Sequence, residues 1–275
     1  MLDIKKITTL SDLSELKTTY FSESTAPLDG MWHFGFVPMS DHFGFYESGK
    51  LVGYCVLNRE GYLLQFYLVP EASVNIADLF TLIIESNSSV IGQVQGAFVS
   101  TAEPQYLSLC LDNSASFKVN AMMYRQNQKS DASRHSGCIE GIKMALATEE
   151  QLDKLVEFAS SAIGAPKEWL TGYYSNLIAR QELWGYWENE RVLATGECRK
   201  FDEHQTQYAD LGMIVAEQER GRGLATRVLN FLTQHVTSQG LEVICSTESS
   251  NIGAQKAIER AGLSSKHRIL QFDFN

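Results

Sequence analysis

Two glycines at a strand-to-helix turn are the residues whose type and spacing most clearly indicate chemistry. Residues 213–225 read MIVAEQERGRGLA and lead directly into the amphipathic stretch TRVLNFL. The first backbone N–H groups of a helix have no partner within it, and the helix dipole adds partial positive charge at the same end. Because Gly221 and Gly223 lack a Cβ, phosphate oxygens can approach this backbone closely. The turn therefore predicts a site for a phosphorylated ligand.

Two well-known phosphate-binding motifs do not fit this turn. A dinucleotide fingerprint needs a third glycine where the chain has Thr226. A P-loop needs Lys and then Ser or Thr after its last glycine, but Leu224 follows Gly223. The alternative to a ligand site is an ordinary turn that happens to carry two glycines.

A different family matches the turn and a second segment behind it. Residues 220–225, RGRGLA, resemble the Arg/Gln-x-x-Gly-x-Gly/Ala loop of the GCN5-related N-acetyltransferase family, which wraps the pyrophosphate of acetyl-CoA. Residues 251–263, NIGAQKAIERAGL, resemble the second acetyl-CoA segment of that family. The two segments stand in the family's order, about 25 residues apart, and two such matches are rarer by chance than one. The resemblance covers residues 138–275.

The resemblance implies acetyl-CoA as the acyl donor and no metal. In this family the strand before the loop splays from its neighbour and offers backbone N–H groups to the pantetheine arm. Gly212 within that strand is a candidate bulge or close-approach site. Arginines and a lysine at 220, 222, 227 and 256 could pair with CoA phosphates or form a solvated helix face. The residues expected to bind acetyl-CoA are Met213, Ile214, Val215, Arg220, Gly221, Arg222, Gly223, Leu224, Ala225, Asn251, Ala254 and Lys256.

The implied activity is transfer of an acetyl group from acetyl-CoA to a primary amine of a small molecule or protein, by direct attack in a ternary complex. An alkyl amine with a pKa of about 10.4 is mostly charged at pH 7, so a base must take its proton. Asp210, inside an otherwise apolar strand, is the first candidate base, although a hydrogen-bonded structural Asp is an equal alternative. Glu248 is the second candidate, and a solvated loop residue is its alternative.

The group that protonates the leaving thiolate is less clear. Many members of the family use a Tyr in the second segment, but the matching residue here is Ile258. Tyr173 is the candidate replacement, with Tyr174, Tyr208 or water as alternatives. A non-catalytic module that binds acetyl-CoA for sensing or assembly is therefore the competing function.

The chain looks duplicated. Residues 43–53, FGFYESGKLVG, align without gaps with residues 184–194, WGYWENERVLA, and each stretch predicts a hairpin. We expect a degenerate acetyltransferase-like domain at 1–128, a polar linker at 129–137 and a catalytic domain at 138–275. In the first half the positions that match Arg220, Gly223 and Ala225 are Val74, Ala77 and Leu79, so we expect that half not to bind acetyl-CoA.

The predicted fold is α/β, a mixed sheet with flanking helices, in two tandem acyl-CoA N-acyltransferase-like domains. In the second half, periodicity predicts a helix capped by Thr148, one over 166–179, one from the glycine turn to about Gln239 and one capped by Asn251. The strands predicted there cover 139–146, 181–188, 191–200, 205–215, 241–245 and 267–274.

The amino-acid composition restricts the classes of partner that the protein could bind. A net charge of −10 over 275 residues argues against nucleic acid. The five cysteines are scattered without CxxC spacing, which argues against a disulfide framework or a zinc site and favours a reducing cytoplasm. No apolar run is long enough to span a membrane, and the first residues do not form a signal peptide. We therefore expect a cytoplasmic monomer or homodimer that acts on a small-molecule or peptide amine.

Overall fold

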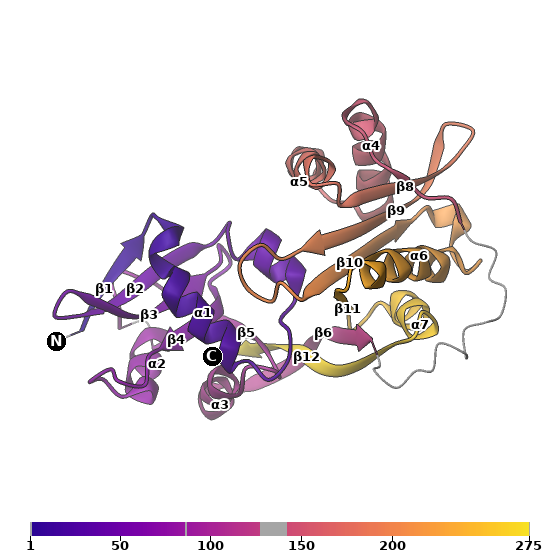
Figure 1. The fold of residues 1–275 in the computed structure, drawn as a ribbon. Helices are drawn as coiled ribbons and strands as arrows, with labels where there is room; N and C mark the ends of the chain where they lie inside the picture. Colours follow the sequence, from indigo (N-terminus) through magenta and orange to yellow (C-terminus); the bar gives the residue numbers. More distant parts are fainter. Residues whose placement is uncertain (1, 86, 127–141, 275) are drawn as a thin grey trace. The chain divides into compact units, whose positions relative to one another are not determined.

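The computed structural model describes residues 2–85, 87–126 and 142–274 (Figure 1). The chain divides into two compact units: unit 1 comprises residues 1–122 and 267–275, and unit 2 comprises residues 123–266. The sequence-based division assigned residues 267–274 to the second half, whereas their contacts group them with unit 1. The predicted linker at 129–137 lies outside the described residues.

Unit 1 is a sheet with helices on both faces. Its strands follow the order β1-β2-β3-β4-β5-β12. Strands β6 (Ser116–Gln126) and β12 (Leu263–Asp273) each contribute residues to both units. The other elements of unit 1 are β1 (Leu2–Ile7), α1 (Ser14–Glu23), β2 (Asp41–Glu47), β3 (Lys50–Leu57), β4 (Tyr62–Leu68), α2 (Ile76–Ile84), β5 (Gly96–Ser100) and α3 (Pro104–Asn113).

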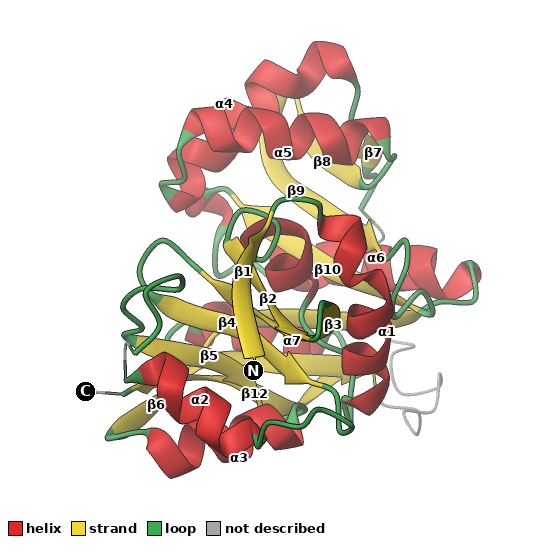
Figure 2. Cartoon of the chain, turned by 90° about the vertical axis from the view of Figure 1, so that its left-hand side faces the viewer, coloured by secondary structure: helices red, strands yellow, loops and turns green. Residues whose placement is uncertain are grey.

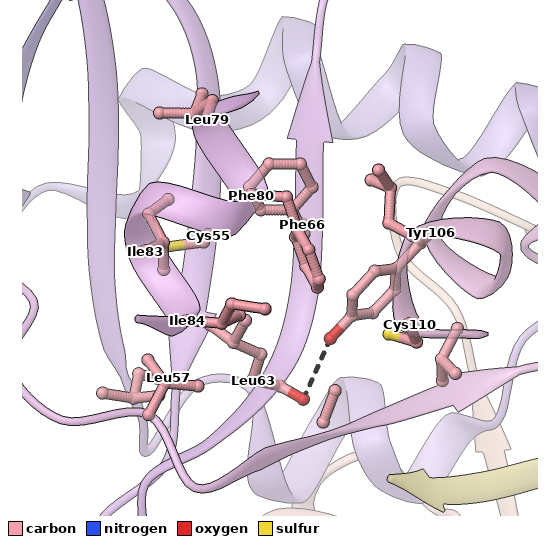
Figure 3. Packing of buried hydrophobic residues seen from close by; sticks show 14 of the residues in the cluster. Cys55, Leu57, Leu63, Phe66, Leu79, Phe80, Ile83, Ile84, Tyr106 and Cys110 are labelled. Carbon is pink, nitrogen blue, oxygen red and sulfur yellow. Dashed lines mark hydrogen bonds between the residues drawn. The ribbon is translucent and has the colours of Figure 1, made fainter. Parts of the chain in front are cut away.

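Helices α2 and α3 lie side by side over one face of these strands (Figure 2). Phe80 of α2 meets Phe66 of β4 edge to face at 5.0 Å between ring centroids. The Tyr106 hydroxyl of α3 donates to the Leu63 carbonyl at 3.1 Å, so the polar end of this buried ring is satisfied (Figure 3). Helix α1 packs on the other face, where Tyr20 contacts Tyr54 and Tyr67.

The C-terminal strand explains the division of the chain. The part of β12 in unit 1 pairs antiparallel with β5, from Ile269 opposite Ser100 to Asp273 opposite Gly96. A Cβ on Gly96 would lie 1.9 Å from the Phe272 carbonyl oxygen, so this pairing needs glycine there. The Asp273 carboxylate also accepts a hydrogen bond from Tyr62 at 3.1 Å. These are long-range contacts that the sequence pattern does not reveal.

Unit 2 has the strand order β6-β11-β10-β9-β8-β7. Its sheet is mixed, because β10 pairs parallel with β11 and antiparallel with β9. Its elements, in addition to the parts of β6 and β12, are β7 (Ala145–Leu146), α4 (Leu152–Ile163), α5 (Lys167–Ala179), β8 (Leu183–Glu188), β9 (Arg191–Lys200), β10 (Tyr208–Val215), α6 (Leu224–Ser238), β11 (Glu242–Glu248) and α7 (Ile252–Arg260).

The helices of unit 2 cover opposite faces of its sheet. The Thr195 side chain of β9 meets Tyr174 of α5, whereas a Cβ on the next residue, Gly196, would touch Val228 and Leu232 of α6. Neighbouring residues of a strand point to opposite faces. Helices α4 and α5 therefore lie on one face and α6 on the other, as Figure 1 also shows.

Most elements predicted for unit 2 are present. Thr148 and Gln151 form a capping box before α4, and Gly240, with φ of +77°, follows the end of α6. The strand predicted over 139–146 is wrong in length: only Ala145–Leu146 pair with β8, and residues 139–141 lie outside the described residues. A strand needs a partner along its length, which periodicity alone does not supply.

The two aligned hairpins have the same geometry. The register shifts just before Tyr46 in the β2–β3 hairpin and just before Trp187 in the β8–β9 hairpin, which are matching positions. Both turns place two residues at positive φ, at 48–49 and at 189–190. A bulge and a turn conserved at equivalent places support the interpretation that the chain is duplicated.

Candidate active site

Strands β10 and β11 separate at their carboxyl ends. Their parallel pairing runs from Tyr208 opposite Glu242 to Leu211 opposite Cys245. Strand β10 continues to Val215 along β9, without a described pair on its β11 side. The gap that opens there agrees with the splay expected from the family resemblance.

The backbone of β10 offers donors to this gap. The Ala216 N–H donates to the Leu193 carbonyl at 2.9 Å, so it points towards β9. Amide direction alternates along a strand, so the N–H groups of Met213 and Val215 point away from β9, into the gap. These two residues, rather than all three of 213–215, are placed to donate to a ligand between the strands.

The glycine turn leaves the start of α6 open. Gly221 and Gly223 have φ values of +77° and +79°, which L-residues with a side chain rarely adopt. Gly223 is the N-cap of α6 and provides no side-chain cap, and a Cβ added to either glycine would meet no atom within 4 Å. The first N–H groups of α6 are therefore accessible to an anion.

A cavity of about 550 Å³ joins the gap to the turn. Ala162 and Ile163 at the end of α4 and Arg260 of α7 also line it, and sequence reasoning had not assigned them. Of the twelve residues predicted to bind acetyl-CoA, all but Arg222 line this cavity: Met213, Ile214, Val215, Arg220, Gly221, Gly223, Leu224, Ala225, Asn251, Ala254 and Lys256.

The two arginines of the loop make internal contacts. Arg220 donates from Nε to the Val215 carbonyl at 3.3 Å and from Nη2 to the Ala162 carbonyl at 2.9 Å. Its side chain thus braces the loop against the end of α4. Arg222 pairs with Glu219 at 3.1 Å on the surface. In this structure the backbone of the loop, more than its guanidinium groups, faces the cavity.

Helix α7 forms the opposite wall. The Asn251 side chain accepts a hydrogen bond from the Ala254 N–H at 3.1 Å, which confirms the predicted N-cap. Lys256 and Arg260 bring positive charge to the cavity lining. Arg227, also considered for phosphate binding, does not line it.

Asp210 lies in a buried ion-pair cluster. Its side chain is fully buried and accepts from Arg199 at 2.6 Å (Nη2) and 3.2 Å (Nε). Arg199 also contacts Glu197 at 2.5 Å. Burial alone would lower the pKa of Arg199, but Asp210 and the other partners hold that pKa well above its ordinary value. Asp210 therefore neutralises a permanent cation, which is a poor situation for a base.

The other predicted catalytic residues are placed as follows. The Tyr173 hydroxyl donates to Glu197 at 2.7 Å, and burial together with that carboxylate raises the pKa of Tyr173. Glu248 is exposed at the end of β11 and receives a hydrogen bond from Ser250. Ile258 is fully buried, and its alkyl side chain has no proton to donate. Sequence reasoning missed Glu197, whose link to Asp210 depends on strand register.

The equivalent turn of unit 1 is occupied by its own side chains. The Glu47 carboxylate accepts hydrogen bonds from the backbone N–H groups of Ser73 and Val74 and from the Ser73 hydroxyl, at 2.8–3.2 Å. These bonds lower the pKa of Glu47. Asn75 caps the start of α2 by accepting from the N–H groups of Ala77 and Asp78. An internal carboxylate and an internal amide thus take the donors that the turn of unit 2 leaves open.

Neither a metal centre nor a membrane span is found in the described parts of the chain. No cluster of three or more His, Cys, Asp or Glu side chains there could hold a metal ion. None of the described helices is long and apolar enough to cross a bilayer.

Comparison with known proteins agrees with this architecture. An acetyltransferase (GNAT) domain model matches residues 9–127, and the acetyltransferase (GNAT) family model matches residues 148–263. The chain is 59% identical to an acetyltransferase of the GNAT family from Colwellia psychrerythraea, with a TM-score of 0.92 over 99% of this chain and 100% of that one. A search of curated proteins finds no match.

Two more distant structures share the fold. A GCN5-related N-acetyltransferase from Sphaerobacter thermophilus is 15% identical, with a TM-score of 0.65 over 98% of this chain and 94% of that one. A tandem GNAT protein from the clavulanic acid biosynthesis pathway is 12% identical, with a TM-score of 0.63 over 100% of this chain and 99% of that one. The chain therefore belongs to the GCN5-related N-acetyltransferase (GNAT) family of acetyltransferases, and it carries two such domains in tandem.

Proposed function

We propose that unit 2 is an acetyl-CoA-dependent N-acetyltransferase that moves the acetyl group to a primary amine by direct attack in a ternary complex. One observation carries the proposal: a single cavity joins the splayed backbone of β10 to the open start of α6. A thioester arm and a pyrophosphate need these two kinds of donor at opposite ends of one site.

The loop and the strand have separate tasks in this proposal. The N–H groups after Gly223 bind the pyrophosphate, with Lys256 and Arg260 supplying charge. The N–H groups of Met213 and Val215 bind the pantetheine arm. The same strand can donate to the thioester oxygen as that atom gains charge in the transition state.

The groups proposed to move protons are those that remain after Asp210 is excluded as the base. Asp210 is fully buried against Arg199, so we do not give it the role of base. Glu248, exposed at the end of β11, is the proposed base, acting through water. The Tyr173 hydroxyl donates its hydrogen bond to Glu197 and is not assigned a role in proton transfer. The side chain of Ile258 has no proton to give, so solvent protonates the thiolate.

A non-catalytic acetyl-CoA-binding module is the second candidate. Two observations favour it: Ile258 stands buried where a proton donor is usual, and Asp210 is neutralised by Arg199. The cavity for the acyl donor is the same in both cases, so the two candidates differ in turnover and not in binding.

Release of CoA thiol separates the candidates. The purified chain is assayed with acetyl-CoA and a panel of polyamines, amino acids, aminoglycosides, aryl-ethylamines and lysine peptides. Thiol release above the rate of hydrolysis, with an acetylated product by mass spectrometry, supports the enzyme. Tight acetyl-CoA binding without such turnover supports the module, and lack of binding refutes both.

The stoichiometry of binding tests the proposed inactivity of unit 1. Glu47 and Asn75 satisfy the donors of its turn, so calorimetry should give one acetyl-CoA per chain. Two sites of similar affinity would show that unit 1 binds as well.

A further inference from the structure

Glu197 lies beside the point at which β10 stops pairing with β11. It is 5% exposed on β9 and pairs across the ladder with Gly212 of β10. Gly212 is the first residue after β10 stops pairing with β11. A Cβ at Gly212 would lie 2.9 Å from Glu197 Oε2, so the carboxylate sits directly over this partly exposed glycine. On the same face two residues further, Ile214 lines the cavity.

The ion pairs described around Glu197 share one cation between two carboxylates. The carboxylates are Glu197 and Asp210, and the cation is the guanidinium of Arg199. Arg199 directs two nitrogens at Asp210 and one at Glu197. A buried charge interacts strongly at low dielectric and is costly unless it is paired. Arg199 therefore serves Glu197 less fully than it serves Asp210.

The hydrogen bonds of Glu197 leave one of its oxygens for a ligand. Tyr173 Oη donates to Oε2 at 2.7 Å, and Arg199 Nη1 reaches both this oxygen and Tyr173 Oη, the latter at 3.0 Å. Among the residues that the structure describes, both hydrogen bonds to this carboxylate end on Oε2. Trp169 stacks on Tyr173 with centroids 4.9 Å apart and planes 13° apart, which holds the phenol in place.

We propose that Glu197 Oε1 binds the ammonium group of the acceptor and so selects amines that are cationic in solution. Tyr173 and Arg199 are positioning residues that hold the carboxylate in this orientation. The inference rests on the proposed function, because it concerns the acceptor of the same transfer. It also explains why Gly212 lacks a side chain: any Cβ would displace the carboxylate from the gap.

Steady-state kinetics with an amine that the wild-type chain acetylates, taken from the panel above, tests the proposal. Glu197→Gln keeps the shape and removes the charge, so the KM for the amine should rise about 10- to 100-fold, as expected for a charge-assisted hydrogen bond. The Kd for acetyl-CoA should stay within about twofold. Glu197→Asp restores the charge and should recover part of the lost affinity.

The matched control is Glu182→Gln. Glu182 is also a buried carboxylate paired with an arginine, Arg180, at 3.0 Å, but its hydrogen bonds go to Arg180 and the Lys200 N–H, away from Gly212. Its loss should change stability and leave the KM for the amine unaltered. Tyr173→Phe removes one hydrogen bond of Glu197 and should raise this KM about 3- to 10-fold.

The outcomes separate the two proposals. If the wild type turns over an amine and Glu197→Gln has the same KM for it, the role of Glu197 is overturned and the proposed function stands. If Glu197→Gln does not fold, an unchanged KM in both Glu197→Asp and Tyr173→Phe overturns it equally. Acetylation of no amine by the wild type removes the proposed function, and this inference with it.

Discussion

Replacement of Gly223 by Val tests the assignment of the acyl-donor site most directly. Gly223 has φ of +79°, and a Cβ there meets no atom within 4 Å. The substitution therefore causes no clash, and its cost is the backbone strain of a left-handed residue, about 1–2 kcal/mol. A domain with a stability of about 5–15 kcal/mol stays folded. Binding suffers more, because the side chain projects from the N-cap of α6, where the pyrophosphate should lie.

The magnitude follows from the donors lost. A hydrogen bond to a charged group contributes about 1.5–3 kcal/mol, so loss of even one loop N–H weakens acetyl-CoA binding about 10- to 100-fold. Gly240→Val is the matched control, because Gly240 has φ of +77°, also lies in open space and ends the same helix away from the cavity. Calorimetry gives the two Kd values, and urea unfolding gives the two stabilities. Equal affinity in both variants would refute the loop assignment.

Three further predictions concern buried groups. Arg199→Gln leaves two buried carboxylates without their cation and should lower the free energy of unfolding by about 3–5 kcal/mol in urea titrations; a loss below about 1 kcal/mol would contradict the ion-pair geometry. Burial raises the pKa of Glu103 to about 7, so the stability that this protonated group contributes is complete below its unfolded pKa of about 4.5 and is lost as the pH rises through 7. Relative to Glu103→Gln, which should lack this slope, the wild type should lose about 3 kcal/mol over that interval, and parallel pH profiles would refute the shift. Ile258→Tyr places a larger ring at a fully buried site and should cost about 1–3 kcal/mol of stability without raising kcat; a gain in kcat would show that the site accepts a proton donor.

Local signals determined the elements of unit 2. The residues expected on the inner side of α6 are all buried: Leu224, Val228, Leu229, Leu232 and Val236. The helical period of 3.6 residues identifies the buried side of a helix without knowledge of what packs against it. Asn251 caps α7 as its residue type predicts. Eleven of the twelve predicted cofactor residues line one cavity, and they stand in the two short segments 213–225 and 251–256. Arg222 is the exception, because its side chain pairs with Glu219.

Long-range contacts decided what the sequence left open. The role of Asp210 depends on Arg199, its partner across the β9–β10 ladder, and no local pattern gives the register of two strands. The same register brings Glu197 over Gly212. In unit 1, Glu47 reaches the turn at Ser73 across 26 residues of sequence.

The sequence by itself therefore determined the family and the duplication, and it predicted the two segments that line the proposed acyl-donor cavity. These rest on backbone geometry that a few adjacent residue types specify, namely glycines at positive φ followed by an amphipathic helix. The tertiary structure decided how Arg199 is shared between Asp210 and Glu197, and the proposed acceptor contact rests on that arrangement. Charge balance in a buried cluster depends on which side chains the sheet brings within a few ångströms, and that is a property of strand pairing.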